Sequence, residues 1–299
     1  MADDQQTPPA THPSQPAGET GTQIDTHTAA AWAARSRTFG AVAQAYAAHR
    51  PDYPDAALDW ALAPLAHLTG RDGGTGRDGR TGPALLDLAA GTGKLTASLV
   101  GRSDHVTAVE PDPEMLAVLH AEQPGVTALA GSAEDIPLPA GSVDAVLVGQ
   151  AFHWFDPERA GAEIARVLRP GGVLAALWNA DDDTVDWVAG YHRAATRERP
   201  VPGVPVGAAR EDLPGGPWFA PTERAEFPHS QRLTVDGLID VLATHSWALI
   251  STPEQRDGAF DRVRRYVAGR PELATGPDGA FELPLRTAVF RAFRLVDRR

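Results

Sequence analysis

The stretch Ala84-Leu85-Leu86-Asp87-Leu88-Ala89-Ala90-Gly91-Thr92-Gly93-Lys94 decides the fold class of this chain. Its first half is a short apolar run bounded by turn residues, which is typical of a buried strand in a parallel sheet. Gly91 and Gly93 lack a Cβ, so they can adopt positive φ and let a ligand approach the backbone closely. Amides that open the following helix then point toward that ligand. The stretch therefore predicts a strand, a turn and a helix around a cofactor of the adenosine type.

Length and composition narrow the class of protein. The chain has 299 residues, 42% hydrophobic and 22% charged, which suits one large α/β domain with additions or two modest domains. Its net charge of −12 argues against nucleic acid or an anionic membrane surface as the main partner. Cysteine is absent, which excludes disulfides and thiolate chemistry. Because no signal-peptide pattern or long apolar stretch is visible, we expect a cytoplasmic protein without membrane contact, as a monomer or homodimer.

After the glycine turn, helical and strand patterns alternate. Helices are predicted at residues 95–100, 113–121 and 157–168, and strands at 106–109, 126–130, 143–148 and 173–177. Right-handed crossovers turn this rhythm into an open parallel sheet with helices on both faces. Residues 285–295 predict a terminal strand at the far edge. The predicted fold class is a Rossmann-like, doubly wound α/β sheet of about seven mostly parallel strands with a terminal antiparallel strand.

Acidic residues follow the first two predicted strands. In such sheets ligands bind outside the carboxyl ends of the strands, and Asp87 and Glu110 both lie there. Glu110 comes 19 residues after Gly91, and its carboxylate can accept two hydrogen bonds from a ribose diol. The alternative for Glu110 is a surface acid. A dinucleotide fits the same spacing, but Thr96 occupies the place of the third glycine of G-x-G-x-x-G, so a nicotinamide-dependent oxidoreductase is the second hypothesis.

Five blocks, in this order along the chain, resemble one known family. They are Phe39 through Tyr46 to Arg50-Pro51-Asp52-Tyr53-Pro54; Leu86-Asp87-Leu88-Ala89-Ala90-Gly91-Thr92-Gly93; Val109-Glu110-Pro111-Asp112-Pro113-Glu114-Met115-Leu116; Gly131-Ser132-Ala133-Glu134-Asp135-Ile136-Pro137; and Gln150-Ala151-Phe152-His153-Trp154-Phe155 followed by Leu168-Arg169-Pro170-Gly171-Gly172. Together they resemble the class I S-adenosylmethionine-dependent methyltransferases. The resemblance is to the small-molecule group with a type 11 methyltransferase domain, which includes trans-aconitate methyltransferase-like proteins.

The resemblance implies a donor site for S-adenosyl-L-methionine, with S-adenosyl-L-homocysteine as the product. Its expected residues are Tyr46, Arg50, Asp87, Ala89, Gly91, Gly93, Glu110, Pro111, Met115, Ser132, Ala133, Glu134 and Gln150. The methionine moiety would lie against residues 87–93, the ribose on Glu110, and the adenine near Pro111, Met115 and residues 132–134. Many relatives carry Asp where this chain has Ser132, which can hydrogen-bond but brings no charge.

The resemblance also implies a division of the chain. Residues 1–28 are expected to be a disordered tail because they are poor in large apolar side chains. Residues 29–68 would form an N-terminal helical lid, and residues 69–82 a flexible Gly/Arg/Asp loop. Residues 83–179 would bind the donor, and residues 180–299 would form an acceptor-binding cap, with helices at 238–245 and 254–267, and the C-terminal strands. In the lid, Arg50 can pair with the donor carboxylate or form a surface salt bridge, and Tyr46 and Tyr53 can cover the donor or belong to the core.

His153 is the candidate for proton chemistry. It follows a predicted strand, and the ordinary pKa of an imidazole suits a general base near neutral pH. The alternative is that His153 builds the pocket. This alternative is favoured because the resemblance places the same motif in relatives with different acceptors. Asn179, Asp181, Asp182 and Asp183 could serve as oxygen ligands for Mg²⁺, but acid runs in loops are more often solvated, so no metal is expected.

The predicted function is methyl transfer by in-line displacement to a small-molecule acceptor, at a carboxylate, hydroxyl, amine or carbon. Two alternatives stay open at the level of sequence. One is the nucleotide-dependent oxidoreductase. The other is a donor-binding protein that uses the site structurally or for non-methylating chemistry. No nucleic-acid or membrane partner is expected.

Overall fold

The structure is a computed structural model that describes residues 50–68, 82–195, 213–214, 216–273 and 278–296. The predicted tail at 1–28, residues 29–49 of the predicted lid, which include Tyr46, and residues 69–81 of the predicted loop lie outside the described residues. Within the described part of the chain, no helix is long and apolar enough to cross a membrane.

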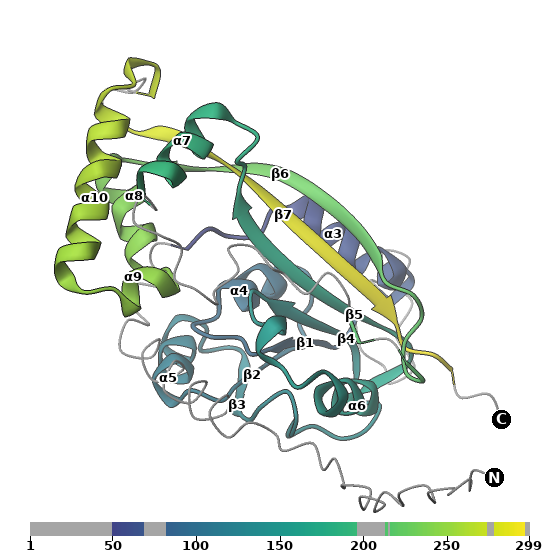
Figure 1. The fold of residues 1–299 in the computed structure, drawn as a ribbon. Coiled ribbons are helices and arrows are strands. Elements are labelled where there is room, and N and C mark those ends of the chain that lie inside the picture. Colours follow the sequence, from purple (N-terminus) through teal and green to yellow (C-terminus); the bar gives the residue numbers. More distant parts are fainter. Residues whose placement is uncertain (1–49, 69–81, 196–212, 215, 274–277, 297–299) are drawn as a thin grey trace, which may run out of the picture.

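Seven strands form one sheet in the order β3-β2-β1-β4-β5-β7-β6 (Figure 1). The strands are β1 (Leu85–Leu88), β2 (Val106–Glu110), β3 (Thr127–Ala130), β4 (Val143–Gly149), β5 (Leu168–Asp181), β6 (Glu223–Leu233) and β7 (Phe281–Phe293). The first five are parallel, whereas β7 runs antiparallel to both β5 and β6. The predicted Rossmann-like α/β fold is confirmed.

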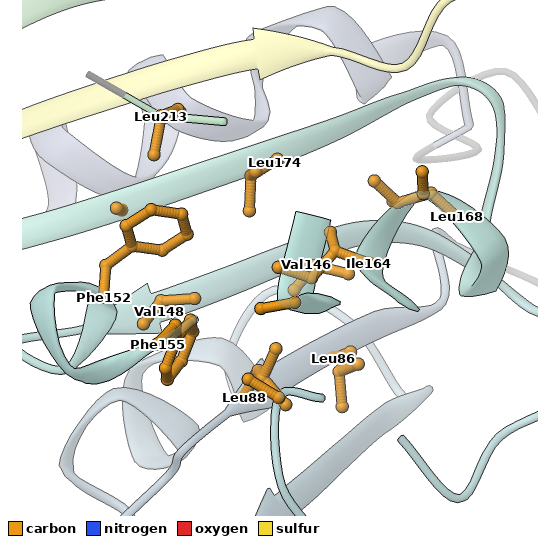
Figure 2. Close-up of a cluster of buried hydrophobic side chains, with 14 of the residues drawn as sticks. Leu86, Leu88, Val146, Val148, Phe152, Phe155, Ile164, Leu168, Leu174 and Leu213 are labelled. Atoms are coloured by element: carbon orange, nitrogen blue, oxygen red, sulfur yellow. The ribbon is translucent and has the colours of Figure 1, made fainter. Parts of the chain in front are cut away.

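Helices cover both faces of this sheet because alternate strand residues face opposite ways. Leu86 and Leu88 of β1 belong to the core that α6 (Pro157–Val167) covers, shown in Figure 2 with Ile164 of that helix. Leu85, the residue before Leu86, belongs to the opposite core, together with Leu58 of α3 (Asp55–Leu62) and residues of α4 (Lys94–Val100). A fourth helix, α5 (Pro113–Glu122), packs on β2 and β3. Apart from Asp87, β1 is apolar because both of its faces are buried, which is why this strand could be predicted from the sequence.

Asp-Pro pairs fix where two of these helices begin. The side chain of Asp112 accepts hydrogen bonds from the backbone N–H groups of Glu114 and Met115, and Pro113 is the first residue of α5. Asp156 and Pro157 start α6 in the same way. A capping carboxylate satisfies amides that the helix leaves unpaired, and proline lacks an amide at this position anyway. The loop after β2 is therefore held in one conformation next to the strand ends.

The sheet differs from the prediction at its antiparallel end. The predicted terminal strand exists as β7, but its place at the far edge was wrong, because β7 lies between β5 and β6. The edge strand β6 was not predicted: its exposed and half-buried residues alternate, without an apolar run. Pro228 lies in β6, which an edge strand tolerates because proline cannot donate to a second neighbour. Strand β5 also extends to Asp181, beyond the predicted 173–177, and begins at Leu168, where α6 was expected to end.

Four helices gather at one end of the β6–β7 pair (Figure 1), and we call them the cap. They are α7 (Asp186–Ala195), α8 (Val235–Ala243), α9 (Ser246–Ile250) and α10 (Pro253–Ala268). Their buried side chains form a third core with Phe281, Leu283 and Leu285 at the start of β7. The predicted helices at 238–245 and 254–267 correspond to α8 and α10 with shifted bounds. Before the sheet, α3 ends at Leu62, and a 3-10 helix, η1 (Ala63–Leu68), follows it and contains Pro64.

Candidate functional site

A pocket lies at the carboxyl ends of the strands, next to the β1–β4 neighbours where the strand order reverses. Ligands of doubly wound sheets bind at this switch point. The pocket contains about 1260 Å³ of space, including the part open to solvent. Predicted donor residues that line it are Arg50, Asp87, Ala89, Gly91, Glu110, Pro111, Met115, Ser132, Ala133, Glu134 and Gln150. The structure thus brings together residues from five separate sequence blocks.

The backbone at this site adopts conformations that side chains disfavour. Ala89 has φ 57° and Gln150 has φ 60°, and these are the two non-glycine residues with positive φ in the described segments. Gly91 has φ 58°, and Gly93 has φ 90° as the residue before α4. Gly93 does not line the pocket; a Cβ there would lie 3.1 Å from Leu119 Cγ, so this glycine allows the turn to pack on α5. Strained backbone of this kind concentrates at functional sites.

Asp87 is the most unusual group in the pocket. Its side chain is fully buried, and its Oδ2 accepts a hydrogen bond of 2.6 Å from Thr96 Oγ1. Its Oδ1 has no hydrogen-bond partner among the described residues, and the same holds for the buried Oγ1 of Thr92. Burial raises the pKa of Asp87 to about 7, and the negative charge of Glu110 adds to this effect. A buried carboxylate oxygen without a partner is costly, so the site favours a ligand with a positive hydrogen-bond donor.

Glu110 joins two turns. Its Oε2 accepts a hydrogen bond of 2.8 Å from the Gly91 amide, and its Oε1 accepts one of 2.9 Å from the Asp112 amide. This carboxylate was expected either to bind a ribose or to be a surface acid; it is buried, and its contacts to the two turns were not predicted. Each carboxylate oxygen has a second lone pair, so both can still accept from a ribose hydroxyl. Burial raises the pKa of Glu110, although the two amide bonds favour its charged form.

Residues 50–53, which we call the entry segment, lie against the pocket and are held by several elements. Asn179 Nδ2 donates to the carbonyls of Pro51 at 3.3 Å and Asp52 at 3.1 Å. Lys94 Nζ forms a 2.9 Å ion pair with Asp52 on the solvent side. Tyr53 lies directly on the backbone of Gly149, where a Cβ would overlap its hydroxyl. The entry segment therefore follows the sheet backbone closely at the end of β4.

Sequence reasoning missed several residues that line the pocket: Thr92, Lys94, Leu95, Asp112, Ala151, Trp154, Phe155 and Asn179. Most of them stand inside the quoted blocks, so the signal was present but was assigned to their neighbours. Asn179 was considered only as a metal ligand. It lies within β5, and its Oδ1 accepts a 2.5 Å hydrogen bond from Thr287 Oγ1. Thr287 stands opposite it on β7, a pairing that no local pattern reveals.

His153 is exposed and does not line the pocket. Its ring lies beside that of Trp154, with centroids 4.6 Å apart, and Trp154 is the residue that faces the cavity. This placement favours the structural interpretation of His153 over the role of a base.

The acidic run after Asn179 is engaged elsewhere. Asp181 accepts hydrogen bonds from Tyr191 and, at 2.7 Å, from His192 of the cap. Asp182 pairs with Arg286 at 3.2 Å. No group of three or more potential ligands that could hold a metal ion occurs in the described ranges.

Comparisons with known proteins agree with this geometry. A family model described as a methyltransferase domain matches residues 86–176. An uncharacterized methyltransferase of Mycobacterium tuberculosis (strain ATCC 25618 / H37Rv) is 42% identical over 257 residues, which cover 86% of this chain and 96% of that protein. An uncharacterized methyltransferase-like protein of Schizosaccharomyces pombe is 36% identical over 73% of this chain and 81% of its own length.

A solved structure points the same way. A protein of Anaeromyxobacter dehalogenans described as a "putative type II methyltransferase" is 26% identical, with a TM-score of 0.60 over 84% of this chain and 100% of that one. The sequence resemblance, the fold and the strand-end pocket thus converge. The chain belongs to the class I methyltransferase family and is a methyltransferase.

Proposed function

We propose that this methyltransferase transfers a methyl group from S-adenosyl-L-methionine to a small-molecule acceptor. The observation that carries the proposal is Asp87, a fully buried carboxylate on the pocket wall whose Oδ1 has no partner among the described residues. The α-ammonium group of the methionine half of the donor is a cationic donor of the kind that this oxygen requires. Family membership supports the same donor.

The other half of the donor fits the groups after β2 and β3. Glu110 can accept hydrogen bonds from the ribose hydroxyls through the remaining lone pairs of its oxygens. Pro111 and Met115 offer apolar surface to the adenine ring, and Ser132 and Ala133 line the same pocket. Arg50 lines the pocket as well, and its guanidinium suits the donor carboxylate. These assignments form part of the proposal.

The chemistry asks little of the protein beyond orientation. When bound, S-adenosyl-L-methionine supplies a methyl carbon activated by a sulfonium. The acceptor atom's lone pair forms the new bond to this carbon while the electron pair of the broken C–S bond stays on sulfur, giving S-adenosyl-L-homocysteine. A hydroxyl or amine acceptor also loses a proton, to solvent or to a nearby base. The chain's part is to align the two partners and exclude water, which saves roughly 7–11 kcal/mol when alignment is good.

The acceptor is proposed to bind between the donor and the cap. Trp154 and Phe155 give the pocket an aromatic wall after β4, and Asn179 adds a polar group after β5. The cap helices lie at the end of β6 and β7, with His192 hydrogen-bonded to Asp181 at the end of β5. This arrangement supports an acceptor of small-molecule size, and the net charge of −12 argues against nucleic acid.

A labelled-donor experiment tests the proposal. The full-length protein is incubated with donor carrying a deuterated methyl group and with pools of small carboxylic acids, phenols and amines. Mass spectrometry then searches for products that carry the label, with the Asp87→Asn protein as the matched blank. A labelled product made by the wild type alone supports the proposal. Binding of S-adenosyl-L-homocysteine without product from any pool would support structural use of the site, and binding of NAD in its place would support an oxidoreductase.

A further inference from the structure

The guanidinium of Arg50 is attached to the cap. Its Nε donates a 3.0 Å hydrogen bond to Thr244 Oγ1, and its Nη2 donates to the Thr244 carbonyl at 3.3 Å. Thr244 is the C-terminal capping residue of α8, 194 positions later in the chain. A residue that lines the donor pocket is therefore oriented by a helix that does not line it.

Thr244 is itself held in place. It is 2% exposed, and its hydroxyl donates a 2.6 Å hydrogen bond to the Val241 carbonyl. Since that bond uses the hydroxyl proton, the oxygen can act toward Arg50 only as an acceptor. The Thr244 carbonyl lies at the C-terminus of α8, where the partial negative charge of the helix favours a cation. Both contacts therefore have a fixed direction.

The acceptors of these two hydrogen bonds are both uncharged oxygen atoms of Thr244. Burial, with the positive charge of Arg50 nearby, lowers the pKa of the neighbouring His245 to about 3. The imidazole of His245 is therefore neutral and does not attract the carboxylate of a ligand. A guanidinium carries five N–H donors in a rigid fork, so fixing Nε and Nη2 also fixes the direction of the others.

We propose that Thr244 is a positioning residue for the methyl donor: it orients Arg50 toward the carboxylate of the donor's methionine half, so that the cap sets donor affinity. The inference rests on the proposed function, because it requires an adenosine-type donor with an amino-acid moiety. It also connects the two halves of the site physically. A change at the end of α8 reaches the donor through one side chain.

Calorimetry with two ligands tests this inference on the full-length protein. S-adenosyl-L-homocysteine has the amino-acid half, whereas 5′-methylthioadenosine lacks it and shares the rest. The Thr244→Val variant keeps the branched shape but loses the hydroxyl acceptor. We expect this variant to bind S-adenosyl-L-homocysteine about tenfold more weakly, which corresponds to the loss of one oriented charge-assisted hydrogen bond. The affinity for 5′-methylthioadenosine should change by less than about twofold.

Three further variants separate positioning from stability. Thr244→Ser restores the hydroxyl and should restore the wild-type ratio of the two affinities. Thr234→Ala removes the hydroxyl that caps the other end of the same helix through a 3.1 Å bond to the Gly237 amide. It should lower the melting temperature but leave the ratio unchanged. In an Arg50→Met background, Thr244→Val should have no additional effect on either ligand, because the two residues act through one contact.

The outcomes distinguish this inference from the proposed function. The positioning role would be overturned if Thr244→Val lowered the affinities for both ligands equally. It would also be overturned if Thr234→Ala changed the ratio of the two affinities as much as Thr244→Val does. Either result would leave the proposed donor site intact. Failure of the wild type to bind S-adenosyl-L-homocysteine at all would overturn the proposed function together with the inference.

Discussion

The donor pocket and the cap are built in different ways. The pocket walls after β1 and β2 come from short, contiguous segments whose turns fix buried carboxylates, as with Asp87 and Glu110. The cap is an assembly of helices around a shared core with the start of β7, joined from residues far apart in the chain. Local chemistry therefore defines what the pocket binds. Long-range packing holds the cap together.

One device occurs in both regions and makes the comparison testable. In the pocket, Tyr53 lies on Gly149, and in the cap, Tyr266 of α10 lies on Gly190 of α7. In each case a Cβ on the glycine would overlap the tyrosine hydroxyl. Equivalent substitutions should therefore have different consequences, on donor binding in one region and on stability in the other.

The largest effect is expected from Asp87→Asn, which separates binding from stability. Removal of the carboxylate should lower the affinity for S-adenosyl-L-homocysteine about 100-fold, because a buried charged hydrogen bond to the ligand's amino group is lost. The folded protein without ligand should become more stable at pH 8, by about 4 kcal/mol at most, since it no longer holds an ionised buried carboxylate whose pKa is raised from 3.8 to about 7. Calorimetry and thermal unfolding measure the two quantities.

The matched control for Asp87 is Asp144, an acid of the same sheet outside the pocket lining. Its Oδ2 accepts a 2.8 Å bond from the Ala84 amide, and its Oδ1 pairs with Arg169 at 2.7 Å. Asp144→Asn should therefore reduce stability and leave donor affinity unchanged, the opposite pattern. If Asp87→Asn behaves like Asp144→Asn, the pocket role of Asp87 is wrong.

The two glycine substitutions come next. Gly149→Ala should displace Tyr53 and lower the affinity for S-adenosyl-L-homocysteine by roughly tenfold or more, since overpacking costs about 1–3 kcal/mol. Gly190→Ala should place a similar cost on the cap, lowering the melting temperature by several degrees with less than about a twofold change in affinity for S-adenosyl-L-homocysteine. A matching loss of donor affinity in both variants would show that the regions are not separable in this way.

The pH dependence of donor binding is a third comparison, within the pocket itself. Burial raises the pKa of Asp87 to about 7. Without ligand the carboxyl is therefore protonated below this pH and must lose its proton before it can bind a cationic amine. The dissociation constant of S-adenosyl-L-homocysteine should rise about tenfold from pH 8 to pH 6.

Proton release provides an independent check. At pH 6.5 the calorimetric enthalpy should differ between buffers of different ionisation enthalpy, because binding releases a proton from Asp87. The same raised pKa means that this group's contribution to folding stability is greatest at low pH and is lost as the pH rises from about 4 through 7. A dissociation constant that stays constant between pH 6 and 8 would contradict the assignment.

Sequence reasoning was most successful where the structure is locally determined. The apolar run of β1, the glycines after it and the Asp-Pro helix starts each carry their own physical cause, so the parallel strands and most of the pocket lining were predictable. The edge strand β6 was missed because it has no apolar run of its own and depends on β7 for pairing. Asn179 and Thr244 were missed as site residues because each acts through partners more than 100 residues away.

The smallest effect is expected from His153→Gln, the variant that would separate a base from a structural residue. The His153 side chain is exposed and its ring lies tilted beside that of Trp154, while Trp154 lines the cavity. Glutamine removes the imidazole's ability to accept a proton near neutral pH but retains polar character. Donor affinity should stay within about twofold, and turnover at saturating acceptor should fall by no more than about twofold, because the indole of Trp154 sets the shape of the pocket.

A base that transfers a proton contributes at least about 100-fold to the rate. A loss of turnover of that size would therefore make His153 a catalytic residue and show that the acceptor reaches past Trp154 toward the surface. The larger variant Trp154→Ala serves as the positive control, since it removes pocket wall and should weaken acceptor binding whatever His153 does.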